Sequence, residues 1–133
     1  LRTDSTGAKQ SKFAFKEDGE YFWIAIIDNG KGNVTNFRTK LSDNNAESFS
    51  TENLNIPPST FLDLQHQLIS VKTFDGKEKA MDYYSFMLSK PAVFADLVQG
   101  SYKTFVISAE NYTIFYKDKN IADYEEFFTE NYQ

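Results

Sequence analysis

The first half of the chain alternates short apolar runs with turn-forming residues. Over residues 12–17, Phe13 and Phe15 alternate with polar neighbours, a pattern that predicts a strand with one solvent-facing side. The run Tyr21–Ile27 is apolar at every position, as in a strand that is buried on both faces. Asp18-Gly19 separates the two runs and predicts a hairpin turn, because both turn residues must accept positive φ.

A third strand is predicted over residues 34–41, although its apolar positions alternate less regularly. Residues 29–33 contain glycines and asparagines and predict the turn that precedes it. The three strands together predict an antiparallel meander. Trp23 is then expected in the core, on a central strand.

Residues 42–58 are rich in Ser, Asn, Asp and Glu and predict a long polar loop. We expect this loop to be the most mobile internal segment and an early site of limited proteolysis. Thr60 and Asp63 then match a weak capping box ahead of leucines at helical spacing, so residues 60–69 predict a helix. A strand stays open as the alternative, because several of these leucines also fit a period of two.

The second half of the chain predicts two more hairpins and two more helices. Asp75-Gly76 is expected to join a strand at 71–74 to one at 79–88, and a short turn to join strands at 102–108 and 111–117. Pro91 and Gly100 bracket a predicted helix at 92–99. A last helix follows Asn120, whose side chain can cap it.

This element order predicts an α+β fold. The expected sheet is mostly antiparallel, with about six or seven strands in the order βββ-α-ββ-α-ββ-α and with helices packed on one face. Residues 1–11 are polar and without periodicity, which predicts a flexible leader or linker. Residues 12–133 have the length of a single domain.

Composition limits the chemistry that this fold can carry. The chain has 133 residues, no Cys, one His, 13 Phe, 8 Tyr and 1 Trp. The aromatic residues supply a core, whereas the missing Cys excludes disulfides, thiol nucleophiles and cysteine-based zinc sites. We therefore expect no cofactor and no structural transition metal; the available carboxylates suit Ca²⁺ or Mg²⁺ better.

The net charge of −5 and the pI near 4.8 argue against nucleic acid or an anionic membrane as the main partner, because both bind basic surfaces. No apolar run approaches the roughly 20 residues that a membrane-spanning helix needs, so no membrane insertion is expected. The partner that fits best is another protein.

Few residues suggest a catalytic site. His66 is the only imidazole, and on the predicted helix it lies away from the leucines, which indicates a solvent-facing histidine. Asp28 follows the apolar strand and is the best single candidate for a special carboxylate, although Asp also commonly starts a turn. Gly30 and Gly32 form only a fragment of a phosphate-binding pattern and are better explained by the turn.

The C-terminal helix predicts the main binding surface. Ile121, Tyr124, Phe127 and Phe128 form its apolar face, and after Lys119 the chain contains no Lys or Arg. Its acidic side and the preceding turn supply the candidate binding residues, which are Asp118, Asp123, Glu125, Glu126 and Glu130. A second candidate surface is an open, aromatic sheet face, which would exist if helices covered only the other face.

Three functions follow from these observations. The first is a non-enzymatic binding module, a bacterial domain exported or tethered at the cell surface; the polar leader and the missing initial Met suggest this location. The second is a small acidic cytoplasmic inhibitor or immunity-type protein that neutralises a basic partner, such as a toxin nuclease. The third, a carboxylate-based hydrolase, has the least support because His and Cys chemistry is scarce.

Overall fold

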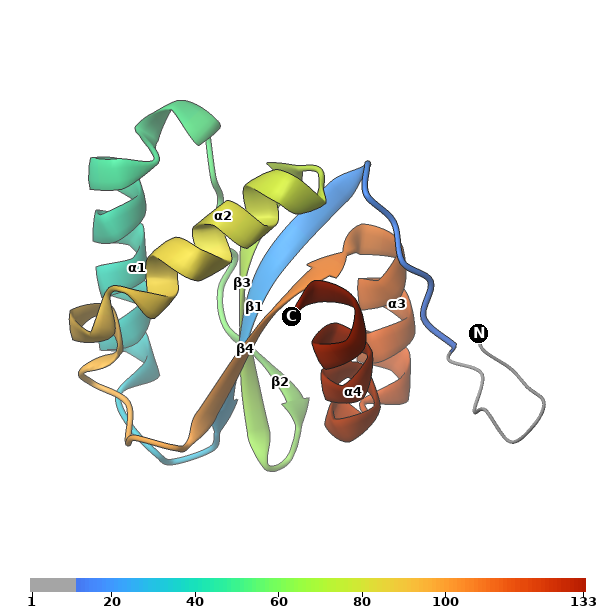
Figure 1. Ribbon diagram of the computed structural model, residues 1–133. Coiled ribbons are helices and arrows are strands. Elements are labelled where there is room, and N and C mark those ends of the chain that lie inside the picture. Colours follow the sequence, from blue (N-terminus) through green and yellow to red (C-terminus); the bar gives the residue numbers. More distant parts are fainter. Residues whose placement is uncertain (1–11) are drawn as a thin grey trace.

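A computed structural model describes residues 12–133 and contains one four-stranded antiparallel sheet with the strand order β2-β3-β1-β4 (Figure 1). The six or seven strands expected from the sequence are therefore wrong, although the α+β class and the antiparallel pairing are correct. The predicted leader at 1–11 lies outside the described residues. The strands and helices are β1 (Glu20–Asp28), α1 (Val34–Ser48), β2 (Thr60–Asp63), β3 (His66–Asp75), α2 (Lys77–Leu88), β4 (Tyr102–Ser108), α3 (Ala109–Asp118) and α4 (Ile121–Tyr132), with short 3₁₀ turns at Ser50–Glu52 and Pro91–Phe94.

Helices cover both faces of the sheet, not one. Neighbouring residues of a strand point to opposite faces, and Trp23 packs against Tyr83 of α2 while Phe22 packs against Tyr112 of α3. Figure 1 shows α1 and α2 on one side of the sheet and α3 and α4 on the other. This arrangement also removes the predicted open aromatic sheet face, because each face is occupied by helices.

The predicted third strand and the loop after it are largely one helix, α1. Asn33 accepts a hydrogen bond from the Asn36 amide and so caps its first turn. The inward positions of α1 begin with Phe37 and Leu41 at helical spacing but continue with two buried asparagines, Asn44 and Asn45. Because these buried positions are polar, the apolar pattern stops after Leu41 and the sequence resembles a loop.

Two other predicted strands are helices, because aromatic residues that favour strands here occupy helical positions. In α2 the buried residues are Ala80, Tyr83, Tyr84 and Met87, whose spacing is helical. Gly76 precedes this helix at φ 97° and does not form a hairpin turn. In α3, the Ser108 hydroxyl caps the first turn by accepting from the amide of Asn111.

The predicted helix at 60–69 is instead a hairpin of β2 and β3, the alternative that the leucine spacing left open. Asp63 accepts a hydrogen bond from the Gln65 amide at 2.8 Å and so closes the turn between the strands. The helix expected at 92–99 is reduced to the 3₁₀ turn at Pro91–Phe94. The strands at 21–27 and 102–108 and the capped C-terminal helix are confirmed.

The first described residues form no strand but a strap, residues 12–17, which crosses α3 and α4. Phe13 is buried against Tyr124 and Phe127 of α4. The Asn111 side chain accepts from the Ala14 amide at 3.1 Å and donates to the Ala14 carbonyl at 2.8 Å, as a neighbouring strand would. Asp18-Gly19 is therefore a bend between the strap and β1, and the predicted three-stranded meander is absent from residues 12–41.

The core contains several tyrosines whose titration should couple stability to alkaline pH. Burial raises the pKa of Tyr83, Tyr124 and Tyr132 well above the ordinary value near 10. Above about pH 10 the unfolded chain releases protons that the folded chain still holds, so the folded state loses stability as the pH rises.

We therefore predict that the melting temperature, measured by circular dichroism at a series of pH values, falls steadily from pH 9.5 toward pH 11.5. Tyr83→Phe removes one hydroxyl whose pKa is raised by burial. The melting temperature of this variant should therefore fall less steeply with pH, whatever its value at neutral pH. A melting temperature that stays constant over this range would contradict the burial of these hydroxyls.

Candidate functional site

A cleft of about 390 Å³ lies at the end of the sheet where β1, β3 and β4 meet the first turns of α4. This volume falls within the range of roughly 300–1,000 Å³ that small-ligand and side-chain pockets occupy. Its lining combines apolar residues with charges of both signs; the lining residues are Ile26, Asp28, His66, Gly100, Ser101, Tyr102, Lys103, Ile121, Ala122 and Glu125. The cleft thus brings together His66, Asp28 and Glu125, which the sequence had placed in three unrelated segments.

His66 is held between two carboxylates instead of facing open solvent as expected. Its Nδ1 lies 2.8 Å from Asp63 Oδ1, and its Nε2 lies 3.7 Å from Asp28 Oδ1. The register explains the second distance, because His66 and Asp28 are partners across the β1–β3 ladder. The hydrogen bond to Asp63 orients the ring at the wall of the cleft, and Asp28 lies near its other nitrogen.

The hydrogen bonds around Asp63 favour its ionised form. Partial desolvation alone would raise the pKa of this carboxyl, but the Gln65 amide and the His66 ring donate to it and together lower the pKa. Asp63 therefore serves as an anionic anchor for His66.

Asp28 takes part in the turn after β1 and also borders the cleft. Its carbonyl accepts a hydrogen bond from the Lys31 amide in the turn after β1, while its side chain lies beside His66. The glycines that follow, Gly30 and Gly32, serve the turn with positive φ angles and not a phosphate loop, and Gly32 also makes a close backbone contact. A Cβ at Gly32 would come within 2.5 Å of the Asp96 carbonyl oxygen, so only glycine fits at this backbone contact.

The predicted acidic surface on α4 is divided into three parts. Lys12 of the strap contacts both Asp118 at 2.6 Å and Asp123 at 2.9 Å. Lys103 of β4 contacts Glu125 at 3.1 Å at the rim of the cleft.

The remaining two candidates, Glu126 and Glu130, are exposed and four residues apart on α4. Neither forms an ion pair with another residue of the described segment 12–133. The structure therefore brings Glu125 into the cleft, ties Asp118 and Asp123 to the strap, and leaves Glu126 and Glu130 on the solvent side.

The apolar part of the cleft could not be predicted from the sequence. Ile121 and Ala122 belong to the first turn of α4, and Tyr102 begins β4. Ile121 had been assigned to the apolar face of the helix, so its position gave no sign that it also borders a cleft. Lys103 could have been found only from the distance between β4 and α4, which no local pattern encodes.

Ser101, the only hydroxyl-bearing Ser or Thr among the lining residues of the cleft, is buried and donates to the Val98 carbonyl at 2.5 Å. Over residues 12–133, no group of three His, Cys, Asp or Glu side chains is placed to hold a metal ion. Within the same residues, none of the helices has the length and apolar character needed to cross a membrane.

The chain matches no protein-family model, no curated protein and no solved structure at a significant level. The site must therefore be interpreted from its own geometry.

Proposed function

We propose that this chain is a non-enzymatic binding module that recognises another protein through the cleft at the end of the sheet. The observation that supports this most is the combination of an apolar floor with a rim of fixed charges. Ile26, Ile121 and Ala122 supply apolar surface, while Lys103 and Glu125 form an ion pair beside it. An apolar anchor surrounded by polar groups is the usual composition of a protein interface.

The hairpin next to the cleft extends this surface. It carries Asp63 and His66, and its turn residue Leu64 is 93% exposed. Phe61, on the same hairpin, is also exposed. Exposed apolar side chains beside a cleft add contact area for a partner. A bacterial, exported or surface-tethered location stays a prediction from the sequence.

A hydrolase has less support. A histidine base needs a free nitrogen directed at a nucleophile. Asp63 orients the His66 ring, as a carboxylate does for many histidine bases, but the Ser101 hydroxyl, the one Ser or Thr hydroxyl in the cleft lining, is engaged with a backbone carbonyl. The acidic-inhibitor function is likewise less supported, because Lys12 and Lys103 already pair with three of the five candidate carboxylates.

The proposal can be tested with peptides selected from a displayed random library on the immobilised protein. Ala122→Arg places a long charged side chain in the cleft from an exposed helix position, so folding should be preserved. We expect it to weaken the selected peptides by at least about tenfold in calorimetric titrations. Leu64→Ser should weaken those peptides that also contact the hairpin.

Each variant has a matched control elsewhere on the surface. Ser85→Arg introduces the same charge on an exposed position of α2, and Leu88→Ser removes a leucine that is 66% exposed. Both should bind the peptides as the unmodified protein does. If the peptides bind Ala122→Arg with unchanged affinity, or if the selection enriches none, the cleft is not the recognition site.

A further inference from the structure

A second pocket, separate from the cleft, lies between α1 and the segment 49–56. Its volume is about 480 Å³, and its lining differs in kind from that of the cleft. It contains the side chains of Ser42, Ser50, Asn53 and Asn55 and a single ionisable residue, Arg38. The pocket therefore combines neutral polar and apolar side chains, and its lining contains no carboxylate and no lysine.

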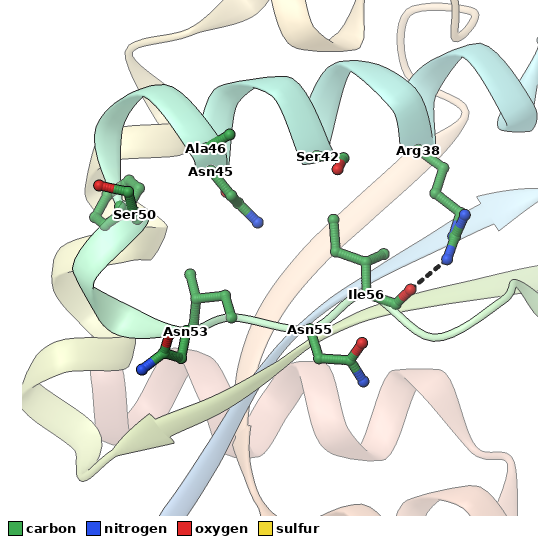
Figure 2. Close-up of a pocket in the computed structure, with 10 residues that line it drawn as sticks. Arg38, Ser42, Asn45, Ala46, Ser50, Asn53, Asn55 and Ile56 are labelled. Carbon is green, nitrogen blue, oxygen red and sulfur yellow. Dashed lines mark hydrogen bonds between the residues drawn. The ribbon is translucent and has the colours of Figure 1, made fainter.

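The outer wall of this pocket is held in place at two points. Arg38 donates from Nε to the Pro57 carbonyl at 3.2 Å. It also donates from Nη2 to the Ile56 carbonyl, the bond drawn in Figure 2. Asn55 exchanges two backbone hydrogen bonds with Lys72 of β3. The segment predicted as a mobile loop thus closes against both a helix and the sheet, and the guanidinium is used to build the wall.

The decisive residue is Asn45, which is only 7% exposed. Its Oδ1 accepts a hydrogen bond from the Tyr83 hydroxyl at 2.7 Å, which fixes the orientation of the amide. Its Nδ2 is buried and has no partner among the described residues. Figure 2 shows this nitrogen directed from α1 into the space facing Asn53 to Ile56. An unpaired buried N–H group is costly, so such groups are rare unless something else binds them.

The remaining polar side chains of the pocket are available as well. Ser42, Ser50, Asn53 and Asn55 make no side-chain hydrogen bond within the part of the chain that the structure describes. Hydroxyl and carboxamide groups each donate and accept, so together they match a ligand whose groups also do both. Sugar hydroxyls have this property, and the one charged group of the lining, the Arg38 guanidinium, already donates to the carbonyls of Ile56 and Pro57.

We propose that this pocket binds a neutral sugar of one or two rings, with one ligand oxygen accepting the hydrogen bond from Asn45 Nδ2. The volume fits a ligand of this size, and Leu54, Ile56 and Ala46 supply apolar surface for the ring carbons. Because Nδ2 is buried, a ligand oxygen reaches it only when side chains of the segment 53–56 move aside, while the backbone bonds of Asn55 to Lys72 and of Ile56 to Arg38 stay in place.

The test uses a panel of neutral mono- and disaccharides, among them glucose, galactose, N-acetylglucosamine, maltose and cellobiose, added to ¹⁵N-labelled protein. At least one sugar should shift the side-chain amide signals of Asn45, Asn53 and Asn55 in a saturable way. The signal of the buried Asn111 side-chain amide, on the other side of the sheet, should not shift. If no sugar of the panel shifts the side-chain amide signals of Asn45, Asn53 or Asn55, the proposal is wrong.

Variants and competing ligands make the result specific. Ser42→Trp fills the pocket from an exposed position of α1 and should raise the dissociation constant at least about tenfold. Ser48→Trp, on the same helix but outside the pocket, should leave it unchanged. If the sugar binds Ser42→Trp with an unchanged dissociation constant, the pocket is not the binding site. If gluconate, glucosamine or an N-acetylated dialanine amide binds as tightly as the neutral sugar or more tightly, the ligand is not a neutral sugar.

Discussion

Replacing Trp23 with Ala is expected to destabilise the protein by about 3–5 kcal/mol, the usual cost of truncating a fully buried large aromatic residue. Trp23 lies at the centre of β1, is fully buried, and packs against Tyr83 and Phe94. For a chain of this length the loss corresponds to a melting temperature lower by roughly 10–25 °C. Calorimetry or circular dichroism should measure it, because the variant lacks the only tryptophan.

Trp23→Phe is the informative companion. It keeps an aromatic ring in the core and removes the indole Nε1, which is buried without a hydrogen-bond partner among residues 12–133. Removing an unpaired donor recovers part of its desolvation cost. Trp23→Phe should therefore be clearly more stable than Trp23→Ala. A Trp23→Ala protein that melts close to the unmodified temperature would contradict the central position of β1.

The second large effect is expected at the strap. Phe13→Ala should cost about 3–5 kcal/mol in urea unfolding, although Phe13 lies only one residue after the first described position. Its ring is 6% exposed and meets the Tyr124 ring edge-on, with the centroids 5.0 Å apart. Removing it opens a cavity between the strap and α4. It also weakens the pairing of Ala14 with Asn111.

Phe15→Ala is the matched control, since it makes the same substitution two residues further along the strap. Phe15 is 41% exposed and contacts chiefly Tyr132, so its loss should cost well under half as much. Equal effects of the two substitutions would mean that the strap does not dock through Phe13. Early protease cleavage within residues 12–17 of the unmodified protein would point the same way.

The sequence predicted three elements whose buried positions are apolar, but it missed α2, whose aromatic residues also favour a strand. β1 and β4 are continuous apolar runs, and α4 combines the Asn120 cap with an apolar face at helical spacing. It failed for α1 and α3, where buried asparagines replace apolar residues: Asn45 accepts from Tyr83, and Asn111 pairs with Ala14. An inward polar residue is recognisable only from its partner, which lies far away in the sequence.

The candidate sites show the same limit. Glu125 was selected for its charge, but its place in the cleft depends on Lys103, 22 residues earlier. His66 was assigned to a helix, and only the β1–β3 register puts it beside Asp28. The Asn45 pocket lay in a segment predicted as a mobile loop, so no chemistry was expected there.

The strand order has a consequence for the synthesis of this protein. Among residues 12–133, β1 is the first strand made, yet both of its partners come later, and the last of them ends at Ser108, 80 positions after Asp28. At about 5–20 residues per second, the ribosome needs about 4–16 s to supply that distance. Throughout this interval the apolar run Tyr21–Ile27 has no completed sheet to enter. The nascent chain should therefore be a good substrate for chaperones that bind short apolar segments, and slow translation of the second half should promote aggregation.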